Sequence, residues 1–239
     1  MCPHNDLDKD LAILISEQLF LLFTRDSGWA KAGISNQDVA LSAGLFSDLV
    51  FAGVIELEES NNSQNPAVRT IDPAPSTDKH PELIVAGYKN ITENPNITVD
   101  KLLHASWFAQ KNEIASALEN RGIITLDQGK FLGAEWEKFP TIDSQPEEEL
   151  RNRLGKIIKG EAEANIQDAV TLIILGEVGN IKVELRKVLN DVSFRDVSAR
   201  MRKLGDQHLE HSSEYAIKAV RQAVNSMVSV LSGSAFFMS

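Results

Sequence analysis

The sequence predicts a mainly α-helical, single globular domain with small β-hairpins. Apolar residues recur at helical spacing along most of the chain. Twice a helical pattern meets a strand pattern at a glycine, in the sequence L-x-x-x-G-[VI]-I-x-L. The 239 residues are 43% hydrophobic and 24% charged, as is ordinary for a soluble globular protein. We expect one domain over residues 1–239, with a polar tail at 1–10, helices and two hairpins at 11–140, and a helical half, forming a bundle, at 141–239.

The N-terminal part begins with a helix at residues 10–23 that is apolar on nearly every side, which predicts burial all round. A turn at residues 25–28 follows. The next helix, residues 38–51, contains no proline and has one apolar face, and Gly53 ends it. Residues 54–58 then alternate apolar and charged side chains, as a half-buried strand does.

The middle of the chain contains the second glycine unit. A polar loop and a short apolar segment at residues 67–71 predict a first hairpin with the strand before them. We then expect an irregular segment at 72–81, which holds three prolines, and helices at 82–90 and 99–120. Residues 118–126 repeat the helix, glycine and strand pattern. A turn at 127–129 and a second hairpin within Lys130 to Pro140 are expected after it.

The remainder is predicted to be helical, because periodic apolar segments alternate with glycines and polar turns. Pro146 and the three glutamates after it are typical of a helix start. The expected helices are residues 146–159, 162–175, 182–190, 194–204 and 213–231.

Charge and composition restrict the function. The net charge of −10 and a pI near 5.0 argue against a protein whose whole surface wraps nucleic acid. There is one cysteine, no secretory signal pattern and no apolar run of about 20 residues, so we expect a cytoplasmic protein. Catalytic signatures are absent, and we expect neither enzymatic activity nor a cofactor. His208 and His211 fall in an expected turn and Glu214 at the start of the helix after it, so no metal site is predicted.

The two units of helix, glycine and hairpin also resemble winged-helix modules, which gives an alternative function in nucleic-acid binding. The helix at residues 38–51 has no lysine or arginine to contact phosphates, which disfavours that alternative.

The chain resembles the Golgi phosphoprotein 3 family over about residues 11–231. The residues that carry the resemblance are Leu11 to Asp26, the spacing of Gly28 and Gly53, Arg121-Gly122-Ile-Ile, Phe131-Leu to Pro140, Leu172-Ile-Ile-Leu and Ala199 to Leu204. The resemblance implies a helical domain without enzymatic activity that binds phosphatidylinositol 4-phosphate headgroups on a membrane surface. Eukaryotic members hold the cytosolic tails of glycosyltransferases at the Golgi. The chain is similar to short, bacterial-type relatives without the basic N-terminal extension of eukaryotic members, and the resemblance leaves its protein partner unknown.

The residues at the family's headgroup positions differ from the family pattern. Eukaryotic members use a tryptophan and three arginines, and ungapped alignment places Gly33, Ser42, Phe108 and Lys111 there. Only Lys111 keeps a positive charge. Because phosphate recognition relies on charged and often bidentate arginine bonds, we expect a largely degenerate phosphoinositide pocket.

Three further surfaces are candidates for contacts. Arg25, Trp29 and Lys31 place an aromatic ring and two cations next to the headgroup positions as a membrane-contacting rim, unless Trp29 packs on the core and the cations are merely solvated. The resemblance implicates the second hairpin in self-association, and its apolar residues would form a patch that needs a partner. These residues are Phe131, Leu132, Trp136 and Phe139. Finally, residues 182–203 carry seven cations and three acids, a local charge of +4 that is either a basic face or solvated helix surface.

Overall fold

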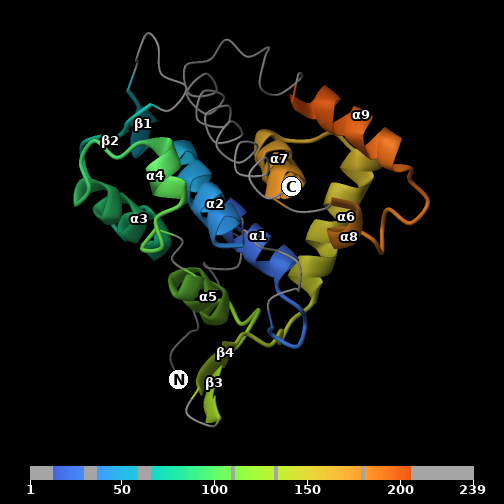
Figure 1. Cartoon of the computed structure of the whole chain (residues 1–239), viewed down its shortest axis with the longest axis horizontal. Helices are drawn as coiled ribbons and strands as arrows, with labels where there is room; N and C mark the ends of the chain where they lie inside the picture. Colours follow the sequence, from blue (N-terminus) through green and yellow to red (C-terminus); the bar gives the residue numbers. More distant parts are fainter. Residues whose placement is uncertain are drawn as a thin grey trace, which may run out of the picture.

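The computed structural model describes residues 13–29, 37–58, 66–108, 111–131, 134–178 and 181–205. This part of the chain contains nine helices and two antiparallel hairpins, which confirms the predicted fold class (Figure 1). The helices are α1 (Ile15–Phe23), α2 (Gln37–Phe51), α3 (Glu82–Thr92), α4 (Val99–Leu103), α5 (Lys111–Asn120), α6 (Gln145–Lys159), α7 (Ile166–Val178), α8 (Ile181–Glu184) and α9 (Phe194–Gly205). The strands are β1 (Ile55–Leu57), β2 (Val68–Thr70), β3 (Asp127–Phe131) and β4 (Ala134–Lys138).

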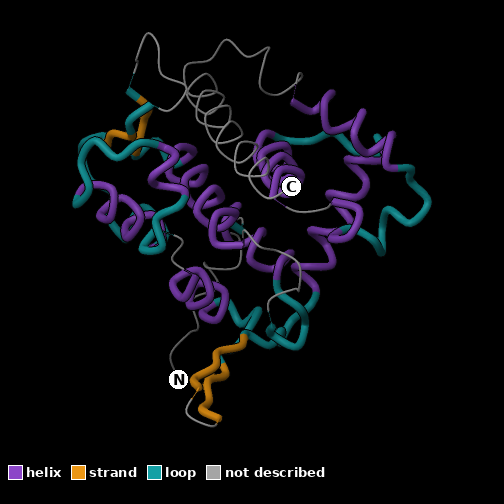
Figure 2. The backbone as a smooth tube through the Cα atoms, in the orientation of Figure 1, coloured by secondary structure: helices purple, strands orange, loops and turns teal. Residues whose placement is uncertain are grey.

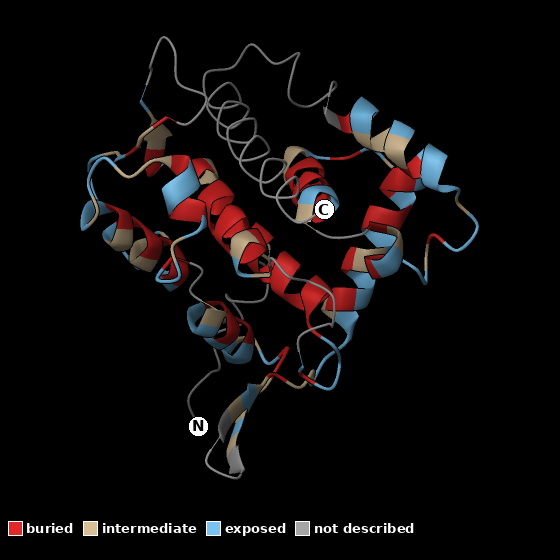
Figure 3. Cartoon of the chain, in the orientation of Figure 1, coloured by how far each residue is buried: buried red, intermediate tan, exposed pale blue. Residues whose placement is uncertain are grey.

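Helices α1 and α2 form the centre of the core. All nine residues of α1 are buried, as its sequence predicts, and α2 crosses it where Gly44 faces Ser16. A Cβ atom on Gly44 would lie 2.8 Å from the Cα atom of Ser16, so only glycine permits this approach. Helices α5, α6 and α7 contact α1, while α3, α4 and α7 contact α2 (Figure 3).

The two glycine units end their helices in the same way, but the chain continues differently after each. Gly53 and Gly122 have φ values of 68° and 72°, and in each case the next residue donates a hydrogen bond to the leucine five positions earlier. After Gly53 the predicted hairpin forms, with Ile55 paired to Thr70. After Gly122 the predicted strand is wrong, because Ile124 makes only an isolated bridge to Thr141.

Two other predictions for the middle of the chain are wrong. The expected turn at residues 127–129 belongs to β3, which pairs with β4 in a hairpin that projects from the helical body (Figure 2). The single helix expected at residues 99–120 is two helices. The chain turns at Ala105, which accepts a hydrogen bond from the N–H of Phe108, and this turn places the Phe108 ring in the core.

The C-terminal half is helical as predicted, with different ends. Helix α7 begins at Ile166 and not at residue 162, and the helix expected at 182–190 is only the short α8 followed by turns. The helix expected at residues 213–231, and the candidate metal ligands before it, lie outside the described residues. Within the described ranges, no helix is long and apolar enough to cross a membrane.

Candidate functional site

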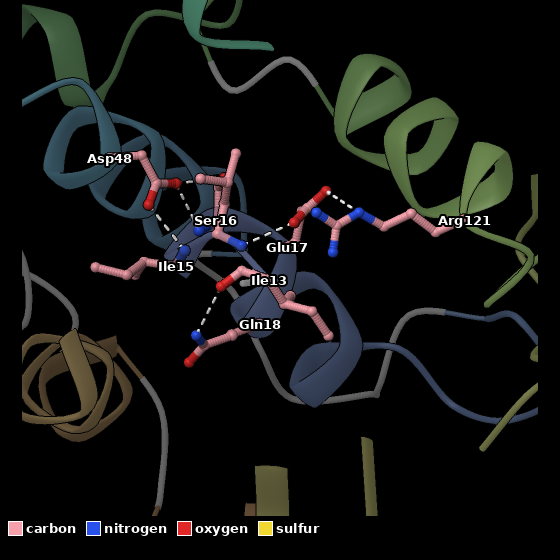
Figure 4. A network of polar contacts seen from close by, with 8 residues as sticks. Ile13, Ile15, Ser16, Glu17, Gln18, Asp48 and Arg121 are labelled. Atoms are coloured by element: carbon pink, nitrogen blue, oxygen red, sulfur yellow. Dashed lines mark hydrogen bonds and ion pairs between the residues drawn. The ribbon is translucent and has the colours of Figure 1, made fainter. Parts of the chain in front are cut away.

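A network of buried polar side chains surrounds the start of α1 (Figure 4). One carboxylate oxygen of Asp48 accepts a 2.8 Å hydrogen bond from the N–H of Ile15. Its other oxygen accepts from the N–H and the hydroxyl of Ser16, at 3.0 and 2.6 Å. Burial raises the pKa of Asp48 to about 7, although these hydrogen bonds act in the opposite direction.

Glu17 and Gln18 extend this network along α1. Glu17 accepts a 2.7 Å hydrogen bond from the N–H of Leu14 and lies 3.8 Å from the guanidinium of Arg121. Burial raises the pKa of Glu17, and the positive charge of Arg121 partly opposes this effect. Gln18 donates to the carbonyl of Ile13 and accepts from the hydroxyl of Thr171. These polar groups bind one another, so the network joins α1 to α2 and α7.

Three of the four family-equivalent headgroup positions, Ser42, Phe108 and Lys111, lie within the described residues. Ser42 and Phe108 are 1% and 0% exposed, so neither offers a polar group to solvent. The Ser42 hydroxyl has no hydrogen-bond partner in the described structure. Lys111 begins α5, and its Nζ atom lies 5.2 Å from the centre of the Phe139 ring. Gly33, like Lys31 of the predicted rim, lies outside the described residues.

The loop that carries Arg25 and Trp29 is fixed against the segment after β4. The N–H of Phe139 donates to the carbonyl of Gly28, and the N–H of Thr141 donates to that of Asp26. Gly28 has a φ of 86°, and a Cβ atom there would lie 2.5 Å from the backbone nitrogen of Phe139. Glycine is therefore required for this docking.

This docking brings Trp29 to the hairpin. The indole centres of Trp29 and Trp136 are 5.9 Å apart, with their planes tilted by 49°. Trp136 lies over Gly129 on β3, at the place where a Cβ atom would be 2.2 Å from its ring. Trp29 remains 47% exposed. Trp29 of the rim and Trp136 of the hairpin, which were predicted to belong to separate features, are therefore in contact.

Lys138 places a positive charge over one of these rings, that of Trp136. Its Nζ atom lies 5.2 Å from the centre of the Trp136 ring and 2.8 Å from a carboxylate oxygen of Asp127. The sequence analysis did not single out Lys138, although residues 136 and 138 share one side of a strand. We call Trp29, Trp136 and Lys138 the aromatic face.

Phe139, another of the predicted hairpin residues, lies in the core and not on this face. Phe139 is 2% exposed and packs edge-on against Phe20, with ring centres 5.3 Å apart. Phe131 ends β3, and Leu132 lies outside the described residues. No group of three His, Cys, Asp or Glu side chains that could hold a metal ion occurs in the described part of the chain.

Comparison with known proteins gives one clear match. The model of the family described as Golgi phosphoprotein 3 (GPP34) matches residues 15–227, which is most of the chain. No curated protein matches the chain.

Proposed function

Because the chain belongs to the Golgi phosphoprotein 3 family, we propose that it is a non-enzymatic protein that binds the surface of a membrane through the aromatic face. The observation that carries this proposal is the contact between Trp29 and Trp136, which joins two distant segments at the surface. Indole rings favour the boundary between lipid headgroups and acyl chains, and a nearby lysine favours anionic headgroups. Its location would be cytoplasmic, at the periphery of a membrane.

The headgroup would be held by charge and not by a specific pocket. Ser42 and Phe108 are buried and uncharged, which leaves Lys111 as the cation among the described family-equivalent positions. A lysine contacts phosphate as a point charge and lacks the two-pronged geometry of arginine. We therefore propose that phosphatidylinositol 4-phosphate is not preferred over another anionic lipid at equal surface charge.

Sedimentation with vesicles tests both parts of the proposal. Phosphatidylcholine vesicles would contain either phosphatidylserine or phosphatidylinositol 4-phosphate, adjusted to the same surface charge. We expect similar retention on both, and a loss of about tenfold or more for the Trp136→Ala variant, because the burial of one indole is lost. Trp107→Ala is the matched control, since Trp107 is 39% exposed and packs against Phe108, outside the aromatic face.

Each contrary result has a defined meaning. Absence of binding to either vesicle would leave only the family and the fold. A strong preference for phosphatidylinositol 4-phosphate would show that the headgroup pocket works despite its substitutions. Equal losses for Trp136→Ala and Trp107→Ala would remove the aromatic face from the proposal.

We also propose that the chain acts as an adaptor, as the family suggests. An adaptor requires a protein partner. The nucleic-acid alternative gains no support, because the second helix-glycine unit does not repeat the strand of the first and α2 carries no cation. A gel shift on duplex DNA at low salt is expected to give no complex.

A further inference from the structure

The exposed face of α9 concentrates positive charge on a protein whose net charge is −10. Val197 and Leu204 are buried beneath it, where α9 contacts α6 and α7. The opposite side faces solvent (Figure 3). Its exposed cations are Arg195, Arg202 and Lys203, and the turn after α8 adds exposed Arg186 and Lys187.

The acidic residues near these cations are occupied or buried. Asp191 lies 2.9 Å from the Nζ atom of Lys159, and Asp196 accepts a 2.6 Å hydrogen bond from the hydroxyl of Ser193. Glu184 is 8% exposed. No ion pair of the five exposed cations occurs within the described ranges. The segment therefore presents a net positive surface to solvent.

Exposed large apolar side chains neighbour these cations in the sequence. Phe194 at the start of α9 is 67% exposed, and Val183 in α8 is 62% exposed. These are two of the most exposed large apolar side chains in the described structure. An apolar side chain that projects between cations is typical of a helix that lies in the interface of an anionic bilayer.

Stability of the fold does not explain these residues. Arg200 has a structural role, because its Nε atom donates a 2.9 Å hydrogen bond to the carbonyl of Ile157 in α6. Arg195, by contrast, lies in the first turn of α9, where the helix dipole disfavours a cation. Phe194 is left mostly exposed by the rest of the described chain, so it gains little from burial.

We propose that this cationic surface, formed by Val183, Arg186, Lys187, Phe194, Arg195, Arg202 and Lys203, binds an anionic lipid bilayer. Attraction would come from the five cations and anchoring from Phe194 and Val183. Exposed apolar side chains next to cations suit a lipid plane better than an acidic peptide, which needs only the charges. This cationic surface is separate from the aromatic face of the proposed function, because α9 and the β3–β4 hairpin lie at different edges of the molecule (Figure 1). Each surface can therefore be altered separately.

The test uses the full chain, vesicles of phosphatidylcholine with about 30% phosphatidylserine, and three charge reversals at Arg195, Arg202 and Lys203 to glutamate. We expect the partition coefficient of this variant to fall by about 100-fold or more, at roughly fivefold for each cation near the surface. Binding of the unaltered chain should weaken as salt rises. A second variant, Phe194→Ser, keeps every charge and is expected to bind several-fold more weakly.

The matched control separates the surface from the net charge. Lys79, Lys89 and Lys101 are exposed, lie outside residues 181–205 and, when changed to glutamate, give the same net charge as the α9 variant. We expect a much smaller loss for this control. Circular dichroism establishes that all variants fold.

Several results would overturn this inference. One is an equal loss of binding for the α9 variant and the lysine control. Another is that the α9 variant still binds vesicles from which Trp136→Ala is released. That second result would leave the aromatic face as the membrane-binding surface. Retention of the chain by polyglutamate but not by vesicles would assign the surface to an acidic protein segment and remove the lipid. If Trp136→Ala binds normally and the α9 variant does not, the proposed function fails and the cationic surface remains.

Discussion

The hydroxyl of Ser16 donates a 2.6 Å hydrogen bond to the carboxylate of Asp48 in the core between α1 and α2. The first N–H groups of a helix lack partners within the helix, and the N-cap residue of α1, Leu14, has no side-chain acceptor. Asp48 accepts from the N–H groups of Ile15 and Ser16 and thus caps α1 from a neighbouring helix.

Asp48 makes stability depend on pH. Burial raises its pKa to about 7 in the folded chain, from the ordinary value of 3.8 that applies on unfolding. Between these values the folded state binds more protons, so the free energy of unfolding falls as pH rises from about 4 to about 7. The Asp48 contribution amounts to roughly 4 kcal/mol at most and levels off above pH 7.

Urea denaturation between pH 4 and pH 8 measures this dependence. Glu17 acts in the same direction, since its pKa is also raised, so the informative quantity is the difference in slope between the unaltered chain and Asp48→Asn. We expect the free energy of unfolding to fall more steeply with rising pH in the unaltered chain than in Asp48→Asn. Ser16→Ala removes a donor to the carboxylate and should move the upper end of the slope to higher pH. Parallel curves for the unaltered chain and Asp48→Asn would contradict this account of Asp48.

The crossing of α1 and α2 predicts opposite effects for two Gly→Ala changes. A methyl group at Gly44 would meet the backbone of Ser16 at 2.8 Å, so Gly44→Ala is expected to destabilise by about 1–3 kcal/mol. Gly176 in α7 is exposed and its nearest neighbour, Cδ1 of Ile181, would be 3.4 Å away. Alanine favours a helix interior over glycine, and Gly176→Ala should stabilise by up to about 1 kcal/mol. Thermal unfolding measures both, and an unchanged or higher stability of Gly44→Ala would refute the close crossing.

Local patterns predicted most helices but not the long-range contacts. Periodicity placed α2, α3 and α6 within about two residues of their ends, because each buries one apolar face. It failed at residues 99–120, where the turn at Ala105 lets Phe108 enter the core. The local pattern also failed at Gly129, where glycine suggested a turn but the residue belongs to β3. Glycine is needed there because the ring of Trp136 occupies the side of the strand where a Cβ atom would lie.

The candidate site was predictable in its residues and not in its assembly. Trp29 and Trp136 were each singled out from composition and resemblance. Their contact depends on backbone hydrogen bonds between residues 26–28 and 139–141, and backbone groups leave no trace in side-chain patterns. The role of Asp48 was hidden for a similar reason, because its partners lie on another helix.

The aromatic face also predicts self-association in the absence of a membrane. Trp29 is 47% exposed beside Trp136, and such a patch gains free energy when a second copy covers it. Light scattering should give a mass above that of one chain, and Trp136→Ala should lower it. The control Trp107→Ala should leave the mass unchanged. A monomeric mass that Trp136→Ala does not alter would exclude the hairpin as a homo-oligomer interface.

Arg151 predicts a strong penalty for a conservative change, because its guanidinium joins three elements. Its Nε atom donates to Glu147 at 2.7 Å, its Nη2 atom lies 3.3 Å from the carbonyl oxygen of Leu22 at the end of α1, and its Nη1 atom donates to the carbonyl of Glu184. Lysine has a single nitrogen and cannot reach acceptors in these three directions. We expect Arg151→Lys to lower the free energy of unfolding by about 2–4 kcal/mol, since buried acceptors lose their donors. Arg195→Lys, on the exposed face of α9, should change it by less than about 0.5 kcal/mol. Urea denaturation of both variants measures these changes. Equal changes in the free energy of unfolding would show that the Arg151 contacts contribute little to the stability of the fold.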